Sequence, residues 1–160
     1  MNEKIYTPTE ISDWILSKVN TEAGDTISPL KLQKLLFYCQ AYYYSQFKKP
    51  LFKERIEAWA HGPVEYTQFK RFENLFRNDP IRVGELNLII PTFDKDEEDF
   101  LNEVIEVYGE HSAHYLERLT HRETPWKEAR GSLEPHERSS NEITLTAMSD
   151  FYSKFLLNDQ

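Results

Sequence analysis

Apolar residues recur at the spacing of an α-helix along most of this chain, and hydroxyl caps followed by proline mark where helices begin. Thr7-Pro8-Thr9-Glu10 combines a hydroxyl N-cap, a proline in the first turn and a glutamate at the third helical position. The other predicted starts are Ser28-Pro29, Ser112, Thr124-Pro125 and Thr144 or Thr146. This punctuation predicts a chain built mainly from helices.

The segment after Pro29 is apolar on almost every face. Its main helical stripe consists of Leu32, Leu35, Leu36, Cys39 and Tyr43, and its other faces carry Phe37, Tyr38, Tyr42 and Tyr44. A helix that is apolar nearly all round is normally buried. We therefore predict that this segment is the central helix and that Leu35 and Leu36 lie in the core.

The apolar spacing shortens after Pro50. Leu51-Phe52 and residues 56–59 indicate two short extended pieces that can pair as a small hairpin. Residues 88–90 indicate a further short strand within a loop.

Longer helices are expected again from Pro63. That proline is predicted to start a long helix ending at residues 78–80, and an acidic segment leads into another helix that ends at Gly109. Residues 131–142 are polar and include a proline, so we expect a mobile loop before the terminal helix. The prediction is an all-α fold: a compact single-domain bundle of six to seven helices over residues 1–160, with one short β-hairpin as an option. A mixed α+β description stays open if the extended pieces pair.

Composition indicates a folded protein with more aromatic side chains than a core of this size needs. The chain has 160 residues, of which 39% are hydrophobic and 14% aromatic. Such a chain can bury a core without disulfides or metal, and some of the aromatic residues are available for an interface. The one cysteine, Cys39, sits among apolar residues, and we find no signal peptide and no apolar run long enough to span a bilayer. We expect a cytoplasmic protein with a reduced core thiol.

The charge is strongly negative and unevenly distributed. The formal net charge is −8, which disfavours non-specific binding to nucleic acid and to anionic membranes. Residues 94–110 contain eight acids and one base. This segment is either a solvated helix face or a docking face for a basic partner.

No residue pattern indicates a metal site or a catalytic centre. His111, His114 and His121 lie close together in sequence, with His61 elsewhere, but their spacing matches no compact zinc motif. There is no nucleophile elbow, and the mid-helix Cys39 would be desolvated as a thiolate. We expect no metal, no cofactor and no enzymatic activity.

A basic stretch raises the question of nucleic-acid binding. Residues 48–82 hold eight bases against five acids, interleaved with aromatics, and Lys70-Arg71 beside Phe69 and Phe72 is compatible with phosphate contact. An ordinary amphipathic helix explains the same residues, and no helix-turn-helix is separable. We do not expect nucleic acid as the partner.

Two eight-residue motifs stand out. Residues 57–64 read Glu-Ala-Trp-Ala-His-Gly-Pro-Val and residues 119–126 read Leu-Thr-His-Arg-Glu-Thr-Pro-Trp, so each holds a tryptophan, a histidine and a proline. Their architectural interpretation is that the glycine and prolines shape turns and helix starts. The tryptophan and histidine side chains fit that role or a partner contact equally well.

Together with Leu32-Gln-Lys-Leu-Leu-Phe-Tyr38 and Pro50-Leu-Phe52, these motifs resemble, in order over residues 11–130, the Panacea-domain (SocA-like) antitoxins of toxin–antitoxin pairs. The resemblance implies an antitoxin of a bacterial, prophage or other mobile-element pair, which neutralises a cognate toxin from the adjacent gene by direct protein–protein interaction. The expected partner-binding residues are Tyr38, Tyr42, Tyr44, Trp59, His61, His121 and Trp126. The expected structural residues are Leu32, Leu35, Leu36, Gly62, Pro63, Thr120 and Pro125. The tyrosine-rich run 41–44 departs from the family pattern and puts local packing in doubt.

Two other classes of function remain open at this stage. One is a DNA-binding regulator, or an adaptor that tethers a client to a cellular protease. The other is an accessory enzyme with a histidine-lined site.

Overall fold

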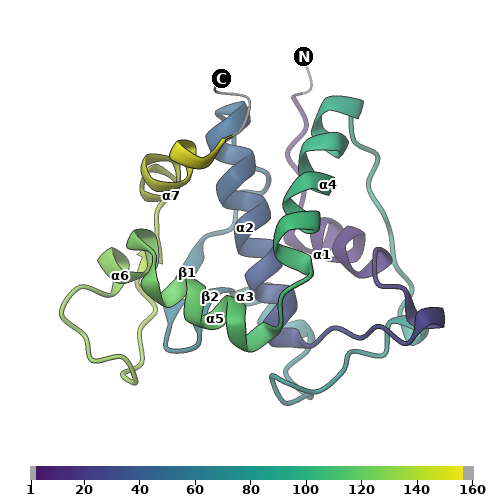
Figure 1. Cartoon of the computed structure of the whole chain (residues 1–160), viewed down its shortest axis with the longest axis horizontal. Helices are drawn as coiled ribbons and strands as arrows, with labels where there is room; N and C mark the ends of the chain where they lie inside the picture. Colours follow the sequence, from purple (N-terminus) through teal and green to yellow (C-terminus); the bar gives the residue numbers. More distant parts are fainter. Residues whose placement is uncertain (1–2, 157–160) are drawn as a thin grey trace.

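Helices account for most of the computed structural model, which describes residues 3–156 (Figure 1). The α-helices are α1 (Pro8–Ser17), α2 (Pro29–Phe47), α3 (Tyr66–Arg71), α4 (Lys95–Gly109), α5 (Ala113–Arg122), α6 (Thr124–Arg130) and α7 (Leu145–Tyr152). The strands are β1 (Ile56–Trp59), β2 (Gly62–Glu65) and β3 (Glu142–Ile143). The predicted helical bundle is confirmed, with a small three-stranded sheet added to it.

Four of the predicted hydroxyl caps form helix starts, whereas Thr124 lies inside α6, whose N-cap is Glu123 with no side-chain cap hydrogen bond. Thr7 Oγ1 accepts from the Glu10 backbone N–H at 3.1 Å, while the Glu10 carboxylate accepts from the Thr7 N–H at 3.0 Å. Ser28, Ser112 and Thr144 each accept from the backbone N–H three residues later. These bonds satisfy donors that the first turn of a helix leaves unpaired.

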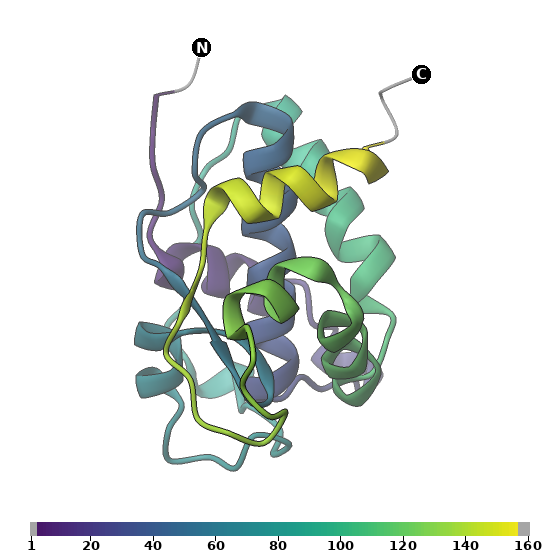
Figure 2. The same ribbon diagram turned by 90° about the vertical axis from the view of Figure 1, so that its left-hand side faces the viewer.

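Helix α2 runs through the middle of the molecule, with α4 on one side and α7 across another face (Figures 1 and 2). Leu35 and Leu36 are 3% and 0% exposed, as predicted. Cys39 is fully buried, and that burial raises the pKa of its thiol. The central-helix prediction is confirmed, and α2 is the element against which most others pack.

The sheet corrects the predicted helix start at Pro63. Strand β1 pairs antiparallel with β2 on one side and with β3 on the other, and Pro63 lies opposite Ala58 in edge strand β2. A proline is tolerated in an edge strand, because its missing N–H need not join the ladder. The helix begins only after Glu65, whose carboxylate accepts from the Thr67 and Gln68 N–H groups. Instead of one long helix to residues 78–80, α3 ends at Arg71.

Two further strand predictions were wrong, one in its pairing and one in the existence of the strand. Phe52 bridges to Tyr6 and does not pair with β1, so the hairpin is formed by β1 and β2. Residues 88–90 form no strand; the Ile89 N–H donates to the Asp13 carboxylate at 2.9 Å. The backbone N–H and C=O groups of these segments are hydrogen-bonded by side chains distant in sequence. Local periodicity gives no signal of such partners.

The polar segment 131–142 is a loop tied down at its start and its end. The Arg130 guanidinium donates to the carbonyl oxygens of Glu134 and Glu137, each at 2.7 Å. The last residue of the segment, Glu142, belongs to β3 and pairs with Glu57. The predicted loop therefore ends one residue earlier than expected.

Helix α4 buries one acid among its apolar residues. Glu97 is 4% exposed and accepts hydrogen bonds from the hydroxyls of Tyr6 and Tyr43. Its neighbours Leu101 and Val104 face the core. Over residues 3–156, no helix is both long and apolar enough to cross a membrane.

Candidate partner-binding site

The motif at residues 57–64 forms the β1–β2 hairpin. Trp59 pairs with Gly62, leaving Ala60 and His61 as the two-residue turn. Gly62 has φ +109°, and a Cβ at this position would lie 2.5 Å from Lys34 Cε. Glycine is therefore required twice, by its backbone angle and by the close approach of α2.

The edge of the hairpin is fixed by two consecutive residues of α2. The Gln33 side chain donates to the Glu65 carbonyl at 3.0 Å and accepts from the Glu65 N–H at 2.8 Å, which imitates a strand partner. Lys34 is 0% exposed and its Nζ donates to the Pro63 carbonyl at 3.2 Å. Burial lowers the pKa of Lys34 to about 7, against the opposing effect of the Glu117 charge. Gln33 and Lys34, from the Leu-Gln-Lys motif of α2, therefore contact the strand that follows the hairpin turn and contains Pro63.

Helix α6 fixes the other side of the hairpin. Trp126 Nε1 donates to the Trp59 carbonyl at 2.8 Å, and Arg130 donates to the Ala58 carbonyl at 3.0 Å. Trp126 is 7% exposed and Arg130 3%. The second motif therefore supports the backbone of the first, and Trp126 is a buried anchor with little surface to offer a partner.

The two motif histidines lie in different surroundings. His61 is exposed at the turn, where its Nδ1 is 3.0 Å from a Glu117 carboxylate oxygen. His121 stacks on the Trp126 ring with centroids 4.1 Å apart, and burial lowers its pKa. His61 is available to a partner, whereas His121 supports Trp126.

His111 and His114 do not assemble a metal site with them. His111 stacks on Tyr115, with ring centroids 4.3 Å apart, while His114 is exposed. No three His, Cys, Asp or Glu side chains within residues 3–156 are arranged to hold a metal ion.

The predicted structural residues are all buried. They are Leu32, Leu35, Leu36, Gly62, Pro63, Thr120 and Pro125. Thr120 Oγ1 lies where a side chain on Gly62 would have to fit, 3.1 Å from the position of its Cβ. Close packing between the hairpin and α5 is therefore a third reason for a glycine at the start of β2.

The expectation of exposed tyrosines on α2 is wrong for two of the three. Tyr38 and Tyr42 are 0% and 8% exposed, while Tyr44 is half-buried. The Tyr38 hydroxyl donates to Glu123 at 2.8 Å, and the Tyr42 and Tyr108 hydroxyls are 2.7 Å apart. These rings fill the space between α2 and its neighbours.

Exposed aromatic rings gather at the hairpin instead. Trp59 contacts Phe69 with centroids 4.8 Å apart, and Tyr66 lies 6.1 Å from Phe69 and 6.5 Å from Trp59. Tyr66 is 49% exposed and Phe69 40%. We call Trp59, Tyr66 and Phe69 the hairpin patch. Such a cluster on a rigid support is typical of the anchors of protein interfaces.

Sequence reasoning found Trp59 but missed the other two rings of the hairpin patch. Phe69 falls within the long helix predicted from Pro63, and that long helix does not form. The available signal was the surplus of aromatic residues. The buried Lys34 and Arg130 were also missed, because a charged residue in an amphipathic helix is normally solvated.

Comparison with known proteins identifies the family. Searches of curated proteins and of solved structures return no match. The family model described as antitoxin SocA-like, Panacea domain, matches residues 32–127. That range contains both motifs, the buried Lys34 and the hairpin patch. The chain therefore belongs to the SocA-like antitoxin family and carries its Panacea domain.

Proposed function

We propose that this protein neutralises a cognate protein toxin by direct contact, and that the hairpin patch supplies the anchoring side chains. The observation that carries the proposal is the cluster that the exposed rings of Tyr66 and Phe69 form with the half-buried Trp59, on a hairpin fixed from α2 and α6. Large rings held in place lose little conformational freedom on binding. Neutralisation of this kind requires burial of a toxin surface and no chemistry by the antitoxin.

The expected partner is the product of the adjacent gene, in a bacterial or prophage pair in the cytoplasm. His61 is exposed at the tip of the same hairpin, two residues after Trp59 in the sequence. We propose that it extends the contact surface as a polar group at the rim, where a hydrogen bond remains accessible to water.

Rescue of growth tests the proposal. Cells that express the adjacent gene should survive only when the antitoxin is co-expressed, and the two proteins should co-purify. Phe69→Ala should abolish or strongly weaken rescue, because truncating an interface anchor commonly costs more than about 2 kcal/mol of binding free energy. Phe76→Ala is the matched control, since Phe76 is 82% exposed and lies outside the hairpin patch.

The outcomes separate the possible mechanisms. If both variants rescue and bind like the wild type, the hairpin patch is not the contact surface. If the adjacent gene is harmless and nothing co-purifies, the antitoxin proposal is wrong. The half-life of the toxin distinguishes neutralisation from tethering to a protease: direct neutralisation leaves an intact complex, whereas an adaptor makes the toxin disappear.

A further inference from the structure

Helix α4 presents a second stripe beside the one that faces the core. Asp96, Phe100, Glu103 and Val107 recur at i, i+4, i+7 and i+11, so they share one face of the helix. Val107 is 55% exposed. Carboxylates and apolar side chains alternate along about 16 Å of this face, or three helical turns. We call this the α4 stripe.

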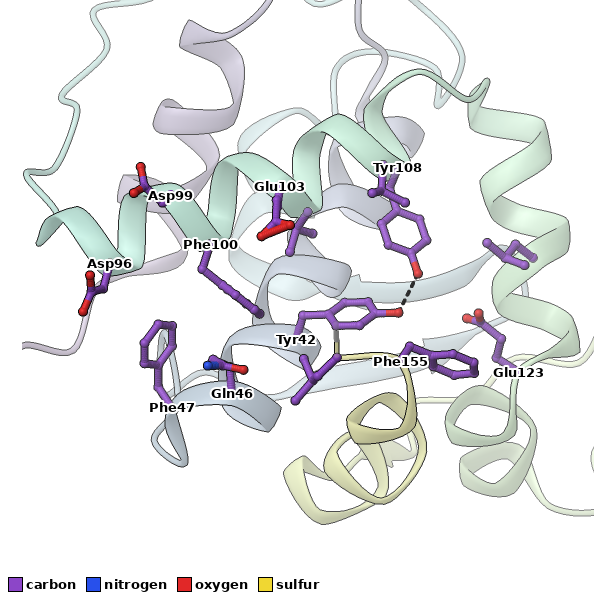
Figure 3. Close-up of a pocket in the computed structure, with 14 residues that line it drawn as sticks. Tyr42, Gln46, Phe47, Asp96, Asp99, Phe100, Glu103, Tyr108, Glu123 and Phe155 are labelled. Atoms are coloured by element: carbon purple, nitrogen blue, oxygen red, sulfur yellow. Dashed lines mark hydrogen bonds between the residues drawn. The ribbon is translucent and has the colours of Figure 1, made fainter. Parts of the chain in front are cut away.

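The α4 stripe forms one wall of an open groove of about 640 Å³ (Figure 3). The facing wall is made by Tyr42, Gln46 and Phe47 of α2, with Phe155 near the end of the described chain. Glu123, the residue before α6, closes one end. Phe155 is 52% exposed. The groove therefore leaves apolar side chains in contact with water on both walls.

The charge of the groove has a single sign. Its lining residues include Asp96, Asp99, Glu103 and Glu123, and none of the residues within 3–156 that line it is a lysine or an arginine. Asp99 does pair with Lys95 at 3.0 Å, but both side chains are more than half exposed. An exposed pair of this kind contributes about 0.3–0.5 kcal/mol. A partner's cation can therefore replace Lys95 at little cost.

Beneath these side chains, the base of the groove is held by tyrosine hydroxyls. Glu123 accepts from Tyr38 at 2.8 Å and from Tyr152 at 2.7 Å. The Tyr42 and Tyr108 hydroxyls are 2.7 Å apart, and the Tyr38 and Tyr108 rings stack with centroids 4.0 Å apart. This packing keeps the groove open as a preformed surface, which lowers the entropic cost of binding.

We propose that this groove binds a basic amphipathic α-helix of the toxin; the inference rests on the proposed function in taking the toxin as the partner. A helix with apolar residues at i, i+4 and i+7 flanked by Lys or Arg matches the α4 stripe in spacing and in charge. The length of the stripe favours a helix over a compact ligand. Nucleic acid and a second copy of this acidic chain would both be repelled by the four carboxylates.

The first experiment measures the rate of association with the toxin for two double variants of equal charge change. Asp99→Lys/Glu103→Lys reverses two carboxylates that line the groove, and Glu22→Lys/Glu98→Lys makes the same change of charge at two exposed acids that do not line it. The groove variant should lose about tenfold or more in association rate at low salt, and the control should lose much less. Val107→Lys should weaken binding, whereas Ile89→Lys, at a residue 70% exposed elsewhere, should not.

A second experiment works without the toxin. The probe is a synthetic helical peptide with a leucine seam flanked by lysines, compared with the same seam flanked by glutamates. The wild type should bind the lysine peptide, weakly at high salt, and the groove variants should not. Equal binding by groove and control variants in either experiment overturns the proposal.

The two experiments separate failure of this inference from failure of the proposed function. If the wild type rescues cells and the groove variants rescue and bind equally well, the groove inference is wrong and the antitoxin function stands. If no rescue occurs at all, the proposed function fails, and the peptide experiment alone judges the groove. If the groove variants change the oligomeric state and peptide binding is absent, the occupant is a second copy, which also overturns the proposal.

Discussion

The hairpin patch and the α4 groove both display aromatic rings, but they are held in place by different chemistry. At the hairpin, Lys34, Trp126 and Arg130 donate to backbone carbonyls of β1 and β2. Beneath the groove, the Glu123 carboxylate accepts hydrogen bonds from the hydroxyls of Tyr38 and Tyr152. The first arrangement fixes the course of the chain, whereas the second fixes side chains on helices that are already formed.

This difference implies different sensitivities. Loss of a donor at the hairpin leaves a backbone carbonyl buried without a partner and frees a short two-stranded element, which is only marginally stable on its own. Loss of a tyrosine hydroxyl near the groove leaves two long helices packed through their apolar faces. Variants at the hairpin should therefore disturb folding more than variants beneath the groove.

The largest effect is expected for Trp126→Ala. The change removes a buried ring and the donor to the Trp59 carbonyl, and such truncations cost about 3–5 kcal/mol. Trp59→Ala is the control at the other partner of the same bond, since the Trp59 side chain is only half-buried and its backbone carbonyl remains. Denaturant unfolding should show a much larger loss for Trp126→Ala. Equal losses would mean that the hairpin is not fixed from α6.

The next effect is a pH dependence that comes from Lys34. Its folded-state pKa is about 7, below its ordinary value of 10.5. Between these values the unfolded state binds more protons, so the free energy of unfolding should rise with pH by at most about 1.4 kcal/mol per unit. The raised pKa of the buried Cys39 thiol opposes this rise above about pH 8.5, equally in any Lys34 variant, and the raised tyrosine pKa values oppose it above about pH 10.

The measurement compares the wild type with Lys34→Met between pH 7 and pH 9. The variant keeps the long apolar stem and has no proton to lose, so the rise should be absent from its curve. Any contribution from Lys31, whose pKa is also lowered by burial, is common to both proteins. Parallel curves would show that Lys34 keeps an ordinary pKa and that the hairpin rests on a permanent charge.

A smaller effect is expected for Gly62→Ala. The new Cβ would lie 2.5 Å from Lys34 Cε, so the side chain or the hairpin must move. Gly24→Ala is the control, because Gly24 has φ +88° with no atom within 4 Å of its Cβ position. Gly62→Ala should cost about 1–3 kcal/mol more than the control, the usual cost of overpacking. A thermal melt of both variants gives the difference, and equal melting temperatures would mean that only the backbone angle matters.

Local pattern was enough to predict most helices but not the hairpin or either surface. The caps at Thr7, Ser28 and Ser112 were readable because capping depends on residues within one turn. Pro63 was assigned to a helix start because proline suits the first turn of a helix. Its strand is held by Gln33 and Lys34 of α2, about 30 residues away in sequence. Long-range partners of this kind leave no periodic signal.

The candidate surfaces show the same limit. The acids of residues 94–110 indicated either a solvated face or a docking face, and sequence alone does not say which of them line a groove. Spacing on α4 separates them once its bounds are known: Asp96 and Glu103 lie on the groove side and Glu98 does not. Tyr38, Tyr42 and Tyr44 were expected to contact a partner because tyrosine favours interfaces. Tyr42 instead finds a hydroxyl partner on α4 and is buried.

The smallest effect is expected beneath the groove, for Tyr38→Phe. The ring and its packing remain, and only the hydrogen bond to Glu123 is lost, which costs about 1.5 kcal/mol, the low end of the range for a charged acceptor. Glu123 keeps the hydroxyl of Tyr152 at 2.7 Å, so it is not left without a partner. Tyr44→Phe, at a half-buried neighbour, is the control and should change stability very little. Chemical denaturation of the two variants measures the difference. A loss for Tyr38→Phe as large as that for Trp126→Ala would mean that the tyrosine–carboxylate contacts hold the helices together as firmly as the hairpin is held, and the contrast between the two surfaces would disappear.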